Sequence, residues 1–358
     1  MYDDAINRAA FRRIPILSPT LSSRDHFDPD PQTMTTAAML RRLHVLLALA
    51  AASGCGGLPS QLRSTNTSPE TARIISEDIP RFWIAFDKMT SASDTIPLRV
   101  DYLDHGTDGL KDFTNLRWKN ARTLASMIWP IRAYYASVRQ NTLSVVSLEP
   151  QLRRAYRMLD SLYDDAVFPD VYLAIGGMGT GGTTSDRGLL IGAELFTRAS
   201  DSPVSVLSPW GQSVVKSVDI LPAIVAHELT HYEQKYGASA SNLLAQSIRE
   251  GSADFVSELL TGRTINESIM VYGNAHEAEI WREFSAAMNG ADYSRWLYNG
   301  GTITASSTRP ADLGYYVGYK ITQAYYTRQS DKRRALKDIL QIGDFAKFLQ
   351  ASGYGAGL

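Results

Sequence analysis

The stretch "IVAHELTHYEQ", residues 224–234, places two histidines four residues apart, with a glutamate directly after the first. On a helix, residues four apart share one face, so His227 and His231 would present their imidazoles one turn apart. That spacing suits two ligands of a tetrahedral zinc ion. Glu228 would lie beside them, in the position of a general base. The alternative is a surface helix that carries two histidines by chance.

A second helical pattern follows in "REGSADFVSELLTG", residues 249–262. Glu250 lies nineteen residues beyond His231, and Asp254 lies one helical turn beyond Glu250. Two packed helices would bring Glu250 to the third ligand position of the metal. Asp254 would then be free to hydrogen-bond the far nitrogen of a ligand histidine, which such sites need. We therefore predict a Zn²⁺ cofactor.

The pair "HELTH" and "EGSAD" resembles the motif of the gluzincin zinc metallopeptidases. The resemblance implies an α+β fold that is mostly helical, with a zincin-like metallopeptidase core, a small β-hairpin or sheet and an N-terminal helical lobe. It also implies a role for each matching residue: His227, His231 and Glu250 as metal ligands, Glu228 as general base, and Asp254 as support for a ligand histidine.

A narrower resemblance extends over most of residues 165–354. The segments "YLAIGGMGTGG", "IGAELF", "EGSADF", "LGYYVGYKI" and "FLQASGYG" are similar to predicted zinc-dependent protease lipoproteins related to gliding-motility lipoproteins. In gluzincins a strand edge before the motif helix binds the substrate backbone. The resemblance implies that "GLLIGAELF", residues 188–196, provides this edge.

The sequence before the predicted domain has the order of a bacterial lipoprotein signal. Residues 34–55, "MTTAAMLRRLHVLLALAAASGC", join two arginines, an apolar run and small residues to Cys55. The apolar run is too short to span a membrane, and Ala52 stands where leucine is usual. We predict that Cys55 is lipidated and anchors the protein in the envelope of a Gram-negative bacterium, at the outer membrane or facing the periplasm. A buried helix is the alternative.

Composition narrows the remaining classes of function. The chain has 358 residues, 44% hydrophobic residues, a net charge of −1 and one cysteine. A single cysteine excludes disulfides within the chain and a cysteine-rich zinc finger. The near-zero charge gives no reason to expect nucleic acid as a partner. A peptide or protein substrate and the membrane are the predicted partners.

The chain divides into five predicted segments. They are an upstream or disordered part (1–33), the signal (34–55), a tether (56–67), a helical lobe (68–166) and a zincin-like domain (167–358). In the lobe we predict helices from Ser68, over 112–139 with a break at Pro130, and over 150–165. In the domain we predict strands at 170–176 and 188–196, paired as a hairpin, then helices over 221–236, 242–261, 265–288, 311–328, 331–342 and 344–351.

The loop between the two predicted strands, "GMGTGGTTSDR", is rich in glycine. It lacks the Gly-Lys-Ser/Thr ending of a phosphate-binding P-loop, and a strand rather than a helix follows it. We therefore expect a flexible loop at the rim of a cleft.

A zinc peptidase also needs a hydrogen-bond donor for the oxyanion that forms during attack on the peptide bond. Tyr315 and Tyr316, in "RPADLGYYVGYKI", are the predicted catalytic donors, and Tyr319 follows one turn later. Each could instead be an ordinary core aromatic. His276 is a weaker candidate for donor or ligand, and His105 lies in a sequence typical of a solvated turn.

These observations predict a membrane-anchored zinc metallopeptidase with Glu228 as general base. Two alternatives stay open: a non-catalytic zinc-binding envelope lipoprotein that acts by protein–protein interaction, and a metal hydrolase that acts on a non-peptide amide.

Overall fold

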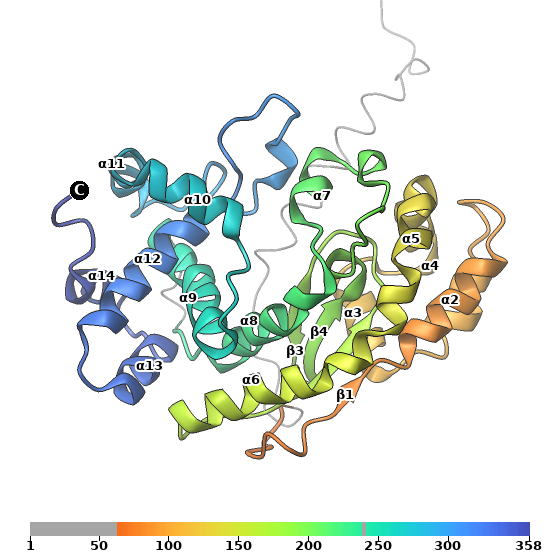
Figure 1. The fold of residues 1–358 in the computed structure, drawn as a ribbon, viewed down its shortest axis with the longest axis horizontal. Coiled ribbons are helices and arrows are strands. Elements are labelled where there is room, and N and C mark those ends of the chain that lie inside the picture. Colours follow the sequence, from red (N-terminus) through yellow and green to blue (C-terminus); the bar gives the residue numbers. More distant parts are fainter. Residues whose placement is uncertain (1–62, 238–240) are drawn as a thin grey trace, which may run out of the picture. The chain divides into compact units, whose positions relative to one another are not determined.

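The computed structural model describes residues 63–237 and 241–358, which lie in one compact unit (Figure 1). The fold is α+β and mostly helical, with one small mixed sheet. Within the described ranges, no helix is long and apolar enough to cross a membrane. Cys55, the predicted signal and residues 1–33 lie outside the described residues.

The first half of the described chain is largely helical. Its helices are α2 (Asp78–Lys88), α3 (Asp108–Leu116), α4 (Ala121–Ile128), α5 (Arg132–Leu143) and α6 (Glu149–Leu162). The helix predicted from Ser68 is wrong at its start, because residues 69–71 form a turn and Ile74–Ile75 form strand β1. Proline is tolerated in the first turn of a helix but not in its interior. Because α2 begins at Asp78, Pro80 lies in its first turn.

The segment predicted as one helix over 112–139 is divided twice. Pro130 interrupts it as expected, within a short 3₁₀ turn, Trp129–Ile131. The other break follows α3, where Lys119 adopts a left-handed backbone with a φ of 67°. Asn120 then caps α4 by accepting a hydrogen bond from the backbone N–H of Thr123, at 3.0 Å.

The sheet has four strands in the order β1-β2-β4-β3: β1, β2 (Asp170–Ala174), β4 (Gly188–Gly192) and β3 (Gly182–Ser185). The predicted hairpin is wrong, since β2 and β4 are parallel, with Asp170 opposite Gly188. The hairpin is formed by β3 and β4, which pair antiparallel. Strand β3 therefore occupies the segment expected to be a flexible loop, and it forms one edge of the sheet.

Helices cover the two faces of this sheet. Gly109 of α3 lies so close to Tyr172 of β2 that an added Cβ would be 2.7 Å from the tyrosine Cβ. Gly182 of β3 faces α8 (Leu221–Glu233) in the same way, as described below. Tyr172 and Gly182 pair with two neighbouring residues of β4, and neighbouring residues of a strand point to opposite faces of the sheet. Helices α3 and α8 therefore lie on opposite faces.

The second half contains the remaining helices. They are the short α7 (Pro209–Val214), α8, α9 (Leu243–Thr261), α10 (Glu267–Ala275), α11 (Glu277–Ala287), α12 (Leu313–Arg328), α13 (Lys332–Leu340) and α14 (Phe345–Ser352). The helix predicted over 265–288 is two helices, which meet at His276. Helix α7 was not predicted, and the remaining helices begin and end within a few residues of the prediction.

Helices α9 and α12 approach each other very closely at their glycines. A Cβ at Gly251 would lie 2.6 Å from the Cα of Gly318, and a Cβ at Gly318 would overlap the backbone of Ser247. Backbones this close fix the position of α9 firmly. One hydrophobic core runs from Ala72 to Phe348, across the boundary expected between residues 166 and 167.

Candidate metal centre

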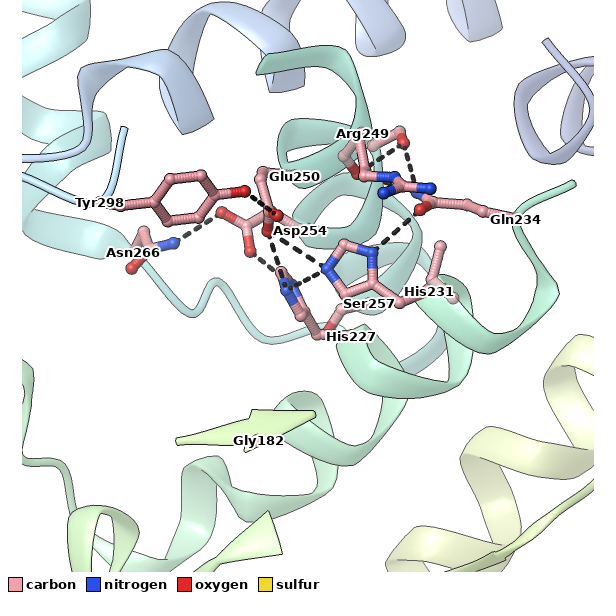
Figure 2. A network of polar contacts seen from close by, with 12 residues as sticks. Gly182, His227, His231, Gln234, Arg249, Glu250, Asp254, Ser257, Asn266 and Tyr298 are labelled. Carbon is pink, nitrogen blue, oxygen red and sulfur yellow. Dashed lines mark hydrogen bonds and ion pairs between the residues drawn. The ribbon is translucent and has the colours of Figure 1, made fainter. Parts of the chain in front are cut away.

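Helices α8 and α9 bring three predicted ligands to one point (Figure 2). The Nε2 atoms of His227 and His231 lie 3.0 Å apart. The Oε2 atom of Glu250 lies 3.2 Å from Nε2 of His231 and 3.7 Å from Nε2 of His227. The two helices are joined next to this point, where the Ser257 hydroxyl donates a hydrogen bond to the carbonyl of Ala223 at 2.6 Å.

The far nitrogen of each histidine contacts an acceptor. Oδ1 of Asp254 lies 2.9 Å from Nδ1 of His227, in the position that the sequence predicts for this carboxylate. Oε1 of Gln234 lies 2.9 Å from Nδ1 of His231. The amide nitrogen of Gln234 donates to the carbonyl of Arg249, at 2.8 Å, which leaves its oxygen facing the histidine. If each Nδ1 donates its proton to this acceptor, each Nε2 is free to bind a metal ion.

This donor set fits a zinc ion. Two imidazole nitrogens and one carboxylate oxygen, which are common ligands of zinc, converge on one point. Bonds of about 2.0–2.1 Å at tetrahedral angles place neighbouring ligand atoms about 3.3 Å apart. The three separations of 3.0, 3.2 and 3.7 Å bracket this value.

Glu228 lies between this point and the sheet. Its carboxyl group faces the backbone of Gly182, where an added Cβ would be 2.6 Å from Cδ of Glu228. Glu228 is 8% exposed, and burial raises the pKa of its carboxyl group. The two histidines oppose this shift. A carboxylate with a raised pKa beside a metal site suits the role of general base, which stays a prediction.

The strand that borders this site is β3. We expected "GLLIGAELF" to be the exposed edge, but β4 lies inside the sheet and all five of its residues are buried. Among the strands of the described residues, β3 pairs only with β4, and its four residues are half-buried. The edge that could accept an extended peptide is therefore Gly182–Ser185, directly beside Glu228.

Sequence reasoning missed Gln234 and also Tyr298. The hydroxyl of Tyr298 donates a hydrogen bond to Oε1 of Glu250, at 2.7 Å, so the carboxylate turns its other oxygen toward the histidines. Tyr298 has a left-handed backbone, with a φ of 55°. Asn299 and Asp312 hold this segment by two reciprocal bonds from backbone N–H to side chain, at 3.1 and 2.8 Å.

The tyrosines predicted as oxyanion donors have different surroundings. The ring of Tyr315 is nearly parallel to that of His227, with 6.4 Å between centroids, so Tyr315 borders the site. The hydroxyl of Tyr316 instead donates to Asn274, at 3.2 Å, and its side chain is 1% exposed. Tyr316 is therefore a core residue. Consecutive residues on a helix point about 100° apart, so Tyr316 does not face the site as Tyr315 does. Tyr319 packs edge-on against Phe255.

The two other histidines that the structure describes lie apart from the cluster. Nδ1 of His276 lies 2.9 Å from the carbonyl of Tyr272, and its ring stacks on the ring of that residue. His105 is exposed in a turn, as predicted.

The model of the family described as gliding motility protein GldB matches residues 69–356, and the chain belongs to this family. The predicted relationship to gliding-motility lipoproteins is thereby confirmed. Membership of this family places the chain in the cell envelope with a lipid anchor. The family description names no peptidase. No curated protein and no solved structure gave a significant match.

Proposed function

We propose that this member of the GldB family is a zinc-dependent peptidase with a zincin-like core, and that it cleaves peptide or protein substrates at the cell envelope. His227, His231 and Glu250 would hold the ion. When bound there, zinc would polarise the substrate carbonyl and lower the pKa of a coordinated water.

The observation that carries this proposal is the number of ligands. Among the residues that the structure describes, the only group of side chains suited to a metal has three members. Structural zinc sites are closed by four protein ligands, whereas catalytic sites keep one position for water or substrate. Glu228 lies next to this group without belonging to it, where it can take a proton from the attacking water and give it to the leaving amine.

Two more groups would act on the substrate. The outer edge of β3, where the Gly182 carbonyl also accepts a hydrogen bond from the Thr180 hydroxyl at 2.7 Å, can pair with an extended peptide, so that the scissile bond lies near Gly182 and Glu228. Tyr315 is the proposed donor to the oxyanion, since its ring lies beside that of His227. Asp254, Gln234 and Tyr298 would position the three ligands.

One observation favours a second candidate. The family is described by its connection with motility rather than by a reaction. The protein would then be a non-catalytic lipoprotein that uses the metal centre to join α8 and α9 and acts by binding other envelope proteins.

The experiment that separates the two candidates combines metal analysis with a peptide-library screen on residues 56–358. We expect one zinc per chain in the wild type, none in Glu250→Ala, and cleavage that disappears in Glu228→Gln while zinc stays bound. Glu279→Gln, an exposed glutamate on α11, is the matched control. Zinc without any cleavage in the wild type would favour the non-catalytic lipoprotein, and persistent cleavage in Glu228→Gln would show that the base is misassigned.

A further inference from the structure

The start of the described chain is fixed to the helix that carries both histidines. The guanidinium of Arg63 lies over the ring of Tyr232, 4.5 Å from its centroid, and donates a hydrogen bond to the carbonyl of the same residue. The backbone N–H of Ser64 donates to the hydroxyl of Tyr232, at 2.9 Å. Tyr232 directly follows His231. Residues 63 and 64 are therefore held one position away from a proposed metal ligand.

The attachment continues along the next residues. The carbonyl of Asn66 accepts a hydrogen bond from the backbone N–H of Phe168, at 2.7 Å, and the Asn66 amide donates back to the Phe168 carbonyl, at 3.0 Å. Further on, Arg73 forms an ion pair with Asp170 at the start of β2. Contacts at successive points make this segment part of the folded body rather than a free tail.

The fixed segment lies at one end of the proposed substrate edge. Besides accepting from Ser64, the hydroxyl of Tyr232 donates to the carbonyl of Asp186, at 3.4 Å. Asp186 belongs to the turn that joins β3 to β4. The tether thus reaches the fold at the end of β3 where Ser185 lies.

The chain between anchor and fold is short. Cys55 precedes Arg63 by eight residues, which span at most about 28 Å when fully extended. A compact chain of about 300 residues has a radius of gyration of about 19 Å and is thus roughly 50 Å across. With Cys55 lipidated, Tyr232 is held within about 30 Å of the bilayer, which is less than the width of the fold. The proposed metal site, which lies next to Tyr232, is therefore also held close to the membrane surface.

We propose that the substrates are polypeptides anchored in the same membrane and cut close to their anchor. This inference rests on the proposed peptidase function. A site restrained near the bilayer meets membrane-bound peptides at a high effective concentration, and it cannot reach bonds held far above the surface.

The test uses the full lipidated protein in phosphatidylethanolamine–phosphatidylglycerol vesicles. The probes are lipid-linked peptides that carry the sequence cut best in the library screen, on stiff polyproline spacers of about 10 or about 30 residues. Such spacers rise about 3.1 Å per residue, so the bond lies at most about 31 or about 93 Å from the bilayer. We expect the wild type to cut the short-spacer probe at least about 10-fold faster than the long-spacer probe.

Two variants make this expectation specific. An insertion of about 40 Gly/Ser residues after Gly57 lengthens the reach by about 35 Å, and residues 56–358 alone lack the anchor. The insertion variant should show a smaller difference between the two membrane probes than the wild type, and residues 56–358 alone should cut both probes at similar rates. Both proteins should cut the free peptide as fast as the wild type, which shows that they are folded. Equal rates on both membrane probes in the wild type would overturn the inference and leave the peptidase proposal standing. If the free peptide is not cut either, the peptidase proposal fails and the inference fails with it.

Discussion

Replacement of Gly182 by alanine tests whether Glu228 is the general base, because it moves the carboxylate without changing it. The added Cβ would lie 2.6 Å from Cδ and 2.7 Å from Cγ of Glu228. Carbon atoms in contact are about 3.5–4.0 Å apart, so the carboxyl group must retreat by about 1 Å. The obstacle is the end of a flexible side chain, so the backbone of β3 can stay in place.

We expect kcat/KM on the best library peptide to fall about 100-fold in Gly182→Ala, since a misplacement of about 1 Å at a reacting group costs about that much. Zinc content should not change, because Glu228 is not a proposed ligand. The free energy of unfolding in urea should change by less than about 1 kcal/mol, since alanine in place of glycine restricts the unfolded chain slightly.

Gly179→Ala is the matched control in the same glycine-rich segment, because a Cβ at this position meets no described atom within 4 Å. It should keep full activity. The reasoning is refuted if Gly182→Ala retains wild-type kcat/KM with zinc bound. Loss of zinc in Gly182→Ala would equally refute it, because the residue would then act on the ligands rather than on Glu228.

Three further predictions concern residues around the site and the core. Asp254→Asn should weaken zinc binding about 10- to 100-fold in a chelator competition, because His227 loses a charged hydrogen-bond partner. Tyr298→Phe should weaken zinc binding in the same assay, because Glu250 loses the hydrogen bond that turns Oε2 toward the histidines. Burial raises the pKa of Glu194 to about 7, above its ordinary value of 4.5, so its stabilising contribution is complete below pH 4.5 and is lost as the pH rises through 7. From pH 4.5 to 8, Glu194→Gln should therefore gain about 3 kcal/mol in free energy of unfolding relative to the wild type.

Each of these predictions has its own contrary result. Unchanged zinc affinity in Asp254→Asn would mean that the carboxylate does not support the ligand. Tyr326→Phe, on the same tyrosine-rich helix as Tyr315, is the control for Tyr298→Phe, and equal affinities in the two variants would remove Tyr298 from the site. A constant difference in stability between Glu194→Gln and wild type across this pH range would show that Glu194 titrates normally in the fold.

The helices that carry the ligands could be predicted well, because their ends have local signals. Pro222 falls in the first turn of α8, Asn242 caps α9, and Gly262 ends α9 in a left-handed conformation. The spacing within "HELTH" also fixes which side chains share a face. Local sequence therefore determined most of the ligand geometry, and the packing of α9 on α12 could be anticipated from Gly251 and Gly318.

The sheet could not be predicted in the same way. Strands β2 and β4 are both apolar runs, and a buried apolar strand carries no local signal of whether its partner is parallel or antiparallel. Strand β3 consists of Gly, Thr, Thr and Ser, without an apolar alternation that would distinguish it from a loop. Its pairing depends on β4, which makes it a product of tertiary structure.

The residues that support the metal ligands differ in how well they can be predicted from the sequence. Gln234 lies three residues after His231, a spacing at which helical side chains meet, so it could have been found. Tyr298 lies 48 residues beyond Glu250 and comes from an irregular segment, so no local pattern connects the two.

The chain direction of β3 determines in which direction a substrate peptide would run through the proposed site. The strand runs from Gly182, beside Glu228, to Ser185, beside the point where the tether meets the fold. A peptide that adds to this edge in the antiparallel sense, the commoner mode of pairing, runs the other way. Its amino-terminal part then lies on the side of the lipid anchor, and its carboxy-terminal part leads away. Polypeptides held in the bilayer by their amino terminus would enter in this orientation, whereas those held by their carboxy terminus would have to turn back on themselves.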